Sequence, residues 1–391
     1  MKEVYVISAV RTPMGSFGGS LKSLTATQLG AIAIKGALQK AGIDGSKVQD
    51  VLMGCVIQAN LGQAPARQAA KFAGLPNEVN CTTVNKVCAS GMKAISLAAQ
   101  SIMLGDADIV VAGGMESMSN APYLLDKARS GYRMGHGQIK DHMMLDGLEN
   151  AYDGKAMGCF AQGTADEKGI TREQMDAFAV QSTTRAQQAI ASGAFANEIT
   201  PVTFQTRKGE MTFAVDEQPG NAKIDKIPSL RPAFAKDGTI TAANSSSISD
   251  GAAALVLMRE SDAKAQGAKP LARVVAHATN SMEPALFTVA PVGAMQKVLQ
   301  KAGWDKQQVD LWEINEAFAM VTMLAINELG LDESKVNVNG GACALGHPIG
   351  ASGARILVTL IHALRNRGLS KGVASLCIGG GEAVALAVEV L

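Results

Sequence analysis

Two cysteines and a histidine of this 391-residue chain lie next to glycine-rich turns, where a side chain can reach a substrate. Cys88 stands just before Ala89-Ser90-Gly91 and an apolar helical stripe. The positive end of a helix dipole lowers the pKa of a nearby thiol and favours the nucleophilic thiolate. Cys88 is therefore a candidate nucleophile toward a carbonyl carbon. The alternative is a buried structural thiol, the usual role of a lone cysteine.

Acid–base chemistry could come from two further residues. His347 lies in Gly346-His347-Pro348-Ile349-Gly350, where its ring can either reach a cleft or bond to backbone. Cys377 ends an apolar run before Ile378-Gly379-Gly380-Gly381, whose N–H groups could form an oxyanion hole. A buried strand cysteine is the alternative there. Asn315 follows another apolar run and could hold a water or carbonyl, or could simply cap a helix.

The elements that must position these residues alternate between short apolar runs and helical patterns, which is typical of α/β folds. Their Val, Ile and Leu content predicts strands buried on both faces. The expected strands are 4–9, 51–56, 108–112, 273–278, 309–314, 373–378 and 384–390.

An internal repeat predicts two similar halves that pack as a pseudosymmetric pair. The segment 37–42 returns at 298–303, an offset of 261 residues. The helix start at 89–93 returns at 351–355, an offset of 262 residues. The loop that holds His347 is thereby the counterpart of the loop that holds Cys88.

The repeat divides the chain into three expected parts. Residues 1–118, completed by about 249–270, form the first half, and residues 271–391 form the second. The segment 119–248 reads as an inserted loop domain that covers the strand ends, where ligands bind in α/β folds. One helix is clear in it, because Thr171-Arg172-Glu173-Gln174 has capping-box spacing.

Charge and cysteine usage exclude several classes of function. The 36 basic and 35 acidic side chains leave a net charge of +1, and aromatic residues make up 4% of the chain, which argues against nucleic acid or membrane as the main partner. None of the six cysteines forms a C-x-x-C pair and the histidines lack metal-ligand spacing, so we expect no metal site. With no signal segment expected in MKEVYVISAVRTP, the prediction is a cytoplasmic protein with reduced thiols.

Four motifs together resemble the thiolase family, and within it the short-chain acetyl-CoA acetyltransferases, over essentially the whole chain. They are Val84-Asn85-Lys86-Val87-Cys88-Ala89-Ser90-Gly91-Met92-Lys93, Asn315-Glu316-Ala317-Phe318, Gly346-His347-Pro348-Ile349-Gly350 and Cys377-Ile378-Gly379-Gly380-Gly381. The resemblance implies an α/β fold of duplicated βαβαβαββ halves in five αβαβα layers. It also implies reversible Claisen condensation of two acetyl-CoA molecules to acetoacetyl-CoA and CoA.

The resemblance also implies the role of each candidate. Cys88 would form an acetyl-enzyme, and Cys377 would remove a Cα proton from a second acetyl-CoA. His347 and a water held by Asn315 would stabilise the enolate oxygen. The N–H groups of Cys88 and Gly379 would stabilise the tetrahedral intermediate.

The family's CoA pocket corresponds to five residues: Ser246, Phe234, Ala317, Phe318 and Met157, the last of which would keep the acyl pocket short. The chain departs from the family where Ala156 replaces a histidine and where 245–250 is unusually rich in serine. We therefore expect Ala156 to admit somewhat larger acyl groups.

Two alternatives stay open at this point: a degradative thiolase of broader chain length, and a catalytically silent protein that binds acyl-CoA. The resemblance implies acyl-CoA substrates, no cofactor besides CoA as substrate and product, and a homotetramer built as a dimer of dimers through residues near 121–142. The CoA phosphates would meet basic residues of the middle segment, of which Arg207, Lys208, Lys223 and Lys226 are candidates. The physiological direction does not follow from the residues.

Overall fold

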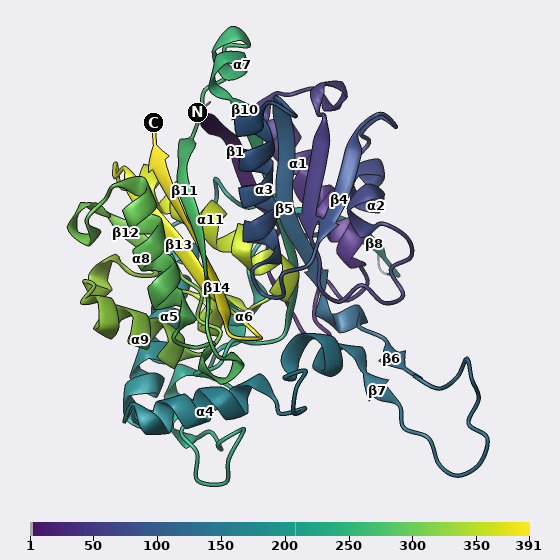
Figure 1. Ribbon diagram of the computed structural model, residues 1–391, viewed down its shortest axis with the longest axis vertical. Helices are drawn as coiled ribbons and strands as arrows, with labels where there is room; N and C mark the ends of the chain where they lie inside the picture. The colour runs from purple at the N-terminus through teal and green to yellow at the C-terminus, as the bar shows by residue number, and fades with distance from the viewer. Residues whose placement is uncertain (1–2, 208) are drawn as a thin grey trace.

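A computed structural model describes residues 3–207 and 209–391, and its centre is a sheet folded into two parts (Figure 1). The strands run in the order β12-β13-β14-β11-β1-β10-β5-β3-β4, with β2 paired to β10. Their bounds are β1 (Val4–Arg11), β2 (Gly15–Ser16), β3 (Asp50–Gly54), β4 (Asn80–Val84), β5 (Ile109–Ser117), β10 (Ser249–Arg259), β11 (Ala272–Ser281), β12 (Leu311–Ile314), β13 (Lys371–Ile378) and β14 (Glu382–Val390). Among the described residues, the two parts of the sheet join where Tyr5 and Val6 of β1 pair with β11.

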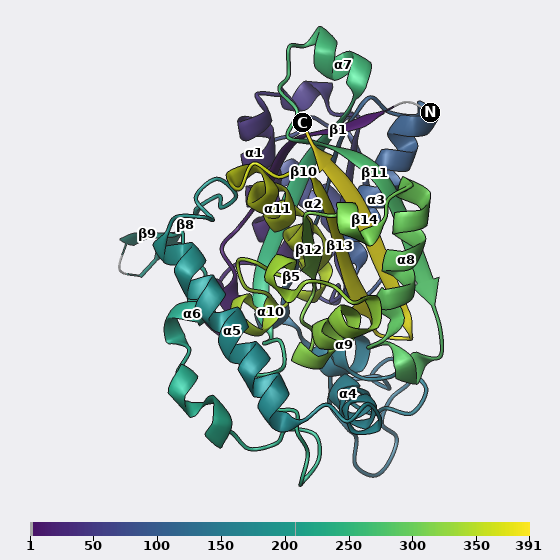
Figure 2. The same ribbon diagram turned by 90° about the vertical axis from the view of Figure 1, so that its left-hand side faces the viewer.

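Helices lie outside and between the two parts of the sheet (Figures 1 and 2). On the outer faces, α1 (Ala26–Ala41) and α2 (Pro65–Phe72) cover the first part, and α8 (Ala290–Ala302) and α9 (Ala319–Leu329) cover the second. Between the parts lie α3 (Ser90–Leu104) and α11 (Ile349–Asn366), whose apolar residues share one core with both. This αβαβα order confirms the predicted fold class.

The internal repeat is visible in the strand order, because β1-β10-β5-β3 and β11-β14-β13-β12 run outward as equivalent strands, and β4 is an additional edge strand of the first part. The repeated helices α1 and α8 both end at a glycine with positive φ, Gly42 and Gly303. At the centre, a Cβ on Gly91 would lie 2.9 Å from the backbone N of Ala354, and one on Gly353 would lie 2.6 Å from that of Met92. These reciprocal contacts show that α3 and α11 cross where neither helix can carry a side chain.

One central strand is not singled out by the apolar pattern. It is β10, which pairs with β1 on one side and β5 on the other. Its sequence begins with Ser249-Asp250-Gly251, and three alanines follow, so it lacks the Val and Ile content that marks the other strands. The stretch Val87–Leu104 is long and apolar enough to cross a membrane, but over half of it is buried as the core helix α3.

The segment between the halves lies at the end of the sheet where β5, β12 and β13 finish, and it carries an arm, β6 (Tyr123–Leu124) to β7 (Lys140–Asp141), that extends from the body (Figure 1). The expected capping box is present, since Thr171 begins α5 with both reciprocal bonds to Gln174. The other elements are a π-turn (Met144–Leu148), α4 (Met157–Glu167), α5 (Arg172–Ala191), β8 (Val202–Thr206), β9 (Gly209–Phe213), α6 (Glu217–Asn221), α7 (Glu260–Ala265), α10 (Ala342–Leu345) and short 3-10 turns at Gly45–Lys47, Met118–Asn120, Ile224–Ser229, Pro284–Leu286, Lys306–Gln308 and Glu333–Lys335.

Candidate active site

Cys88 sits on a strained turn between β4 and α3. The residue before it, Val87, has φ of 45°, a conformation that a β-branched residue rarely adopts. The turn is held by Val87 N–H donating to Asn85 Oδ1 at 3.0 Å and by Lys86 N–H donating to Ser90 Oγ at 2.8 Å. Backbone strain of this kind is typical of functional sites, and here it fixes Cys88 ahead of the helix.

The pKa of Cys88 is raised to about 11, which is opposite to the direction expected from the helix dipole. Burial of the thiol is the main cause, and the N–H groups of Gly379 and Cys88 itself offset it only in part. The nearby carboxylate of Glu116 raises the pKa further. Cys88 is therefore a thiol at neutral pH, and a base must take its proton as it attacks.

His347 is held in the tautomer that a base requires. Its Nδ1 lies 2.5 Å from the hydroxyl oxygen of Ser352, and that hydroxyl donates its only proton to the carbonyl of Pro348 at 3.0 Å. The oxygen of Ser352 must then accept from Nδ1–H, which leaves Nε2 without a proton. The backbone N–H of His347 donates to Ser247 O at 3.0 Å and so fixes the loop.

The ring of His347 stays neutral far below ordinary pH. Its pKa falls to about 3, chiefly because the ring is buried and secondly because of the positive charge on Arg355. An unprotonated Nε2 in a cavity that also contains Cys88 can accept the thiol proton.

Asn315 lies behind His347 and does not line the cavity itself. Its Nδ2 is 3.5 Å from His347 Nε2, and its backbone N–H donates to Ser375 O at 3.0 Å. The side-chain Oδ1 is buried and has no hydrogen-bond partner within the described residues. A buried amide oxygen of this kind suits one ordered water.

Cys377 is the last residue but one of β13, and the chain turns just after the strand through Gly379 toward Cys88. A Cβ on Gly379 would lie 3.7 Å from Met157 Cε and 3.8 Å from Val87 Cγ1. The thiol of Cys377 is buried, and burial together with the charge of Cys88 raises its pKa well above the ordinary value. The two sulfur atoms therefore interact electrostatically, and both are protonated at rest.

Nine of the ten predicted site residues line one cavity of about 410 Å³, which is predominantly apolar. They are Cys88, Met157, Phe234, Ser246, Ala317, Phe318, His347, Cys377 and Gly379. Ala156 lines the same cavity. The structure thus brings together residues from both halves and from the inserted segment.

The wall near Cys377 is aromatic. Phe318 packs edge-to-face against Phe234 and Phe287, with ring centroids 6.1 and 6.4 Å apart. Ser246 closes this wall, since both its backbone N–H and its hydroxyl donate to Ala317 O at 2.9 Å. These contacts give an apolar wall in which the hydroxyl of Ser246 is paired, whereas the buried hydroxyl of Ser245, also on the cavity, has no partner among the described residues.

Glu116 is a functional residue that the motifs did not identify. It is fully buried and accepts N–H bonds from Val56, Ile57 and Gly350 at 2.9–3.1 Å. These bonds tie the segment after β3 to the loop that follows His347. The signal in the sequence is an acid that ends the buried strand run Val110-Val111-Ala112-Gly113-Gly114-Met115, where only a positioned carboxylate is tolerated.

Two of the four basic candidates, Lys223 and Lys226, line a second hollow of about 430 Å³, which shares Ala242 with the cavity. Arg207 lies at the turn between β8 and β9 and lines neither hollow, and Lys208 lies outside the described residues.

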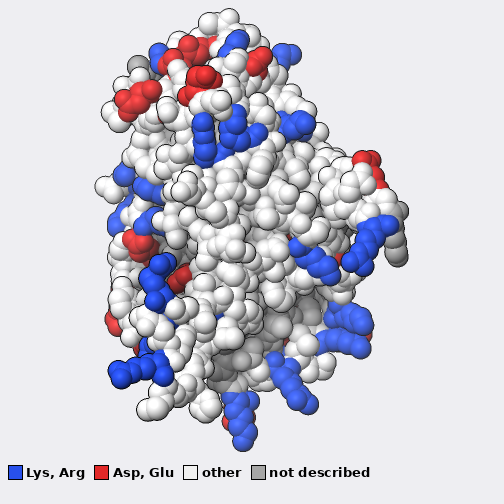
Figure 3. Space-filling model, turned by 90° about the vertical axis from the view of Figure 1, so that its right-hand side faces the viewer, with Lys and Arg blue, Asp and Glu red and all other residues white. Residues whose placement is uncertain are grey.

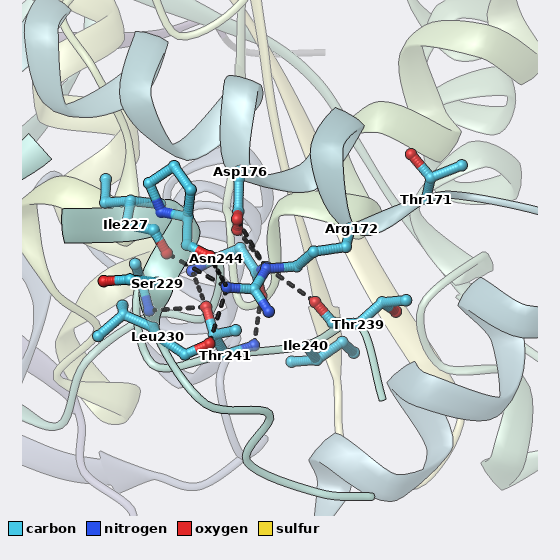
Figure 4. Close-up of polar contacts among 12 residues, drawn as sticks. Thr171, Arg172, Asp176, Ile227, Ser229, Leu230, Thr239, Ile240, Thr241 and Asn244 are labelled. Atoms are coloured by element: carbon cyan, nitrogen blue, oxygen red, sulfur yellow. Dashed lines mark hydrogen bonds and ion pairs between the residues drawn. The ribbon is translucent and has the colours of Figure 1, made fainter. Parts of the chain in front are cut away.

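Arg172 holds the rim of the second hollow in place (Figure 4). Its Nη2 donates to Ile227 O and Leu230 O at 3.2 and 2.9 Å, and its Nε donates to Asp176 Oδ2 at 2.6 Å. The other oxygen of Asp176 accepts from Asn244 Nδ2 at 3.0 Å. One ion pair on α5 therefore fixes both the rim and the segment leading to Ser246. Across the described ranges, no three His, Cys, Asp or Glu side chains form a metal-binding group.

Comparison with protein families shows that two adjoining profiles cover almost the whole chain. The profile described as "Thiolase, N-terminal domain" matches residues 4–261, and "Thiolase, C-terminal domain" matches residues 268–390.

Known proteins of similar sequence and structure extend over the full length. An acetyl-CoA acetyltransferase of Escherichia coli is 54% identical over 100% of this chain and 99% of its own, and one of Schizosaccharomyces pombe is 52% identical over 99% and 98%. A crystal structure of the Bacillus anthracis acetyl-CoA acetyltransferase has a TM-score of 0.98 at 44% identity, covering 100% and 99% of the two chains. The Ascaris suum Acat5 thiolase in complex with coenzyme A has a TM-score of 0.94 at 44% identity, with 100% of both chains covered.

Proposed function

The chain belongs to the thiolase family, and from this premise we propose that it is an acetyl-CoA C-acetyltransferase. It joins two acetyl-CoA molecules into acetoacetyl-CoA and CoA, and it catalyses the reverse thiolysis. The observation that carries this proposal is the single cavity in which Cys88, His347 and Cys377 meet.

The first half-reaction transfers an acetyl group to Cys88. The neutral Nε2 of His347 takes the thiol proton while the sulfur of Cys88 bonds to the thioester carbon of acetyl-CoA. The N–H groups of Cys88 and Gly379 stabilise the oxyanion that forms, and such preorganised donors typically contribute about 10²–10³-fold. The carbon–sulfur bond to CoA then breaks, and the CoA sulfur takes the proton of Cys377, which becomes a thiolate.

The second half-reaction forms the carbon–carbon bond. The thiolate of Cys377 takes a Cα proton from a second acetyl-CoA, and the enolate oxygen accepts from protonated His347 and from a water on Asn315. The enolate carbon attacks acetyl-Cys88, and the bond to Cys88 breaks as its sulfur recovers the proton from His347. All groups return to their resting protonation states.

The variant Cys377→Ala tests this division of roles. We expect Cys88 still to be acetylated, as mass spectrometry would show, because the departing CoA thiolate can take its proton from water, whereas condensation is largely abolished, since a general base typically contributes about 10²–10⁴-fold. Near wild-type turnover of Cys377→Ala would exclude it as the base. A failure of acetyl-CoA to acetylate Cys88 in the wild type would instead favour the silent acyl-CoA-binding alternative.

We propose that the CoA nucleotide binds in the second hollow. Lys223 and Lys226 line it, and it adjoins the cavity through Ala242, so a pantetheine arm could run from one to the other. We expect Lys223→Ala and Lys226→Ala to raise KM for acetyl-CoA while kcat is kept.

Broader chain length is the second candidate function, and Ala156 is the observation that favours it. Ala156 lines the apolar cavity, and a small side chain there leaves room beside the acyl group. Thiolysis assays over a series of 3-oxoacyl-CoA lengths, with 2-methyl substrates included, test this idea. A steep fall in activity from acetoacetyl-CoA to 3-oxohexanoyl-CoA would count against it.

A homotetramer built as a dimer of dimers is also part of the proposal. Strand β4 lies at a sheet edge, and the face on that side has a broad uncharged area (Figure 3). The arm carries exposed Tyr123, Met134 and Ile139, which suits a second contact between copies. Light scattering on the intact chain and on Met134→Asp tests this assembly.

A cytoplasmic location is proposed on the cysteines, all six of which are free in the structure. Free thiols persist in reducing compartments.

A further inference from the structure

The cavity has two apolar walls, and each touches a different reacting cysteine. Cys377 belongs to the cluster that contains Phe287 and Phe318. Cys88 packs instead against a separate cluster whose members include Ile57, Met118, Leu148 and Ile349. We name this second cluster the acyl-side wall, because an acyl group bound to Cys88 would lie against it.

One part of the acyl-side wall is rigidly fixed. The backbone N–H of Ile57 donates to Glu116 at 3.1 Å, and that of Gly350, next to Ile349, donates to the same carboxylate at 2.9 Å. Glu116 is fully buried, so these bonds do not compete with water. Ile57 and Ile349 therefore keep their positions.

The other part of the acyl-side wall comes from the π-turn Met144–Leu148. Three residues of this turn line the cavity: Met144, Gly147 and Leu148. It packs directly on the rigid part, because a Cβ on Gly147 would lie 3.1 Å from Ile349 Cδ1 and 3.8 Å from Ile57 Cδ1. Single π-turns occur frequently at functional sites. The position of this turn thus sets the room left for an acyl chain.

His142 joins the π-turn to the rigid part. Its ring is 4% exposed, and Nε2 accepts the N–H of Ala59 at 3.2 Å. Nδ1 lies 2.7 Å from Oδ2 of Asp146, which belongs to the π-turn, although the ring N–H does not point straight at that oxygen. Since Nε2 accepts a hydrogen bond, Nδ1 carries the ring proton, on the side of the ring next to Asp146.

We propose that His142 is a positioning residue that limits the acyl length the enzyme accepts, by holding the π-turn against Ile57 and Ile349. The inference rests on the proposed thiolase activity. Without the ring, the bridge from Ala59 to Asp146 is lost and the π-turn can move away from Ile349. Room for one methylene in an apolar pocket changes kcat/KM by about 10–200-fold.

The test compares His142→Ala with His142→Gln, whose amide oxygen can still accept the N–H of Ala59. Exposed His136, on the arm that precedes His142, supplies the matched control His136→Ala. We expect the ratio of kcat/KM for 3-oxohexanoyl-CoA over acetoacetyl-CoA to rise about tenfold in His142→Ala. The ratio should return to within about threefold of wild type in His142→Gln and stay unchanged in His136→Ala. An unchanged ratio in His142→Ala overturns the proposal, even if the melting temperature falls.

A second readout does not depend on turnover. Methyl and hexyl methanethiosulfonate each transfer an alkylthio group to a thiol and release sulfinate, and mass spectrometry reports the rate at the Cys88 peptide. We expect the hexyl-to-methyl rate ratio to rise in His142→Ala alone. If the wild type cleaves neither thioester, the proposed function fails, but this ratio still decides the role of His142.

Discussion

Lys86 and Glu382 form an ion pair that joins the two halves beside the site, with Nζ and Oε2 2.5 Å apart. Lys86 lies two residues before Cys88, and Glu382 begins the strand that follows Gly379. The pair therefore clamps the loop of the nucleophile to the loop that supplies the second N–H donor. Ser281 Oγ adds a hydrogen bond to Glu382 at 3.0 Å.

Loss of this clamp should affect the reaction more than stability. Both side chains are partly exposed, so the pair contributes only about 0–1 kcal/mol to folding. We expect Glu382→Gln to slow acetylation of Cys88 about 3–10-fold, since displaced donors stabilise the oxyanion less well. Quench-flow measurement of acetyl-Cys88 checks this. The matched control is Glu389→Gln. Glu389 lies on the same strand as Glu382 and pairs with Arg273 of β11, so its loss should leave the rate of acetylation unchanged.

Ser352→Ala removes the acceptor that selects the tautomer of His347. Without it, Nδ1–H loses its partner and Nε2 is protonated in part of the molecules, so fewer rings can act as base. We expect acetylation of Cys88 to slow about 10–100-fold, a share of the usual contribution of a general base. Ser96 likewise donates to a backbone carbonyl, that of Met92, at 3.0 Å inside α3. Ser96→Ala is the matched control, and an equal slowing of both variants would contradict the assignment.

The depressed pKa of His347 makes a signed prediction for stability. The folded state takes up this proton only near pH 3, whereas an unfolded histidine does so near pH 6.5. Between these values the unfolded state binds more protons, so stability falls as the pH is lowered, by at most about 1.4 kcal/mol per pH unit. We expect His347→Gln to flatten this fall in urea unfolding between pH 6.5 and 4.5. If stability fell equally with pH in the wild type and in His347→Gln, the pKa of the His347 ring would not be depressed.

Glu116 titrates in the opposite direction. Burial raises its pKa to about 7, although three backbone N–H bonds oppose the shift. Stability from the protonated form is fully present below the unfolded pKa and is lost as the pH rises through 7. Glu116→Gln should remove this pH dependence and cost about 1–3 kcal/mol, because one acceptor oxygen replaces two. Unfolding free energies at pH 5 and 7.5 measure both effects.

The crossing of α3 and α11 predicts a steric cost. A methyl group at Gly353 would lie 2.6 Å from the backbone N of Met92, so Gly353→Ala should destabilise the chain by about 1–3 kcal/mol or more. Gly163 of α4 has open space around its Cβ position, so Gly163→Ala should be neutral or gain up to about 1 kcal/mol. The midpoints of urea unfolding distinguish the two.

Much of the fold and the membership of the site could be predicted because they depend on local patterns. Cys88, His347 and Cys377 each adjoin glycines that let backbone approach a substrate, and the repeat places two of their loops as counterparts. The predicted lowering of the Cys88 pKa is wrong, because burial of the thiol outweighs the helix dipole. That burial depends on how the inserted segment covers the turn.

Contacts between distant segments could not be read from the chain. Glu116 accepts bonds from 56–57 and from Gly350, more than 200 residues away, and nothing near it in sequence marks that partner. The role of His142 likewise depends on its contacts with Ala59 and Asp146, and the contact with Ala59 joins segments 83 residues apart. The apolar pattern does not reveal strand β10 because small and polar residues make up its first half, and its burial comes from the strands paired on both sides.

The duplication has an evolutionary consequence. If both halves descend from one ancestral half, a symmetric ancestor carried each catalytic position twice. The positions 262 residues away from Cys88, His347 and Cys377 are now Gly350, Asn85 and Met115. Gly350 is held by Glu116, and Asn85 accepts the N–H of Val87 beneath Cys88. On this view, Gly350 and Asn85 belong to a copy of the site that lost its catalytic residues and now holds the loops of the active copy in place. A change in one copy would therefore affect the other.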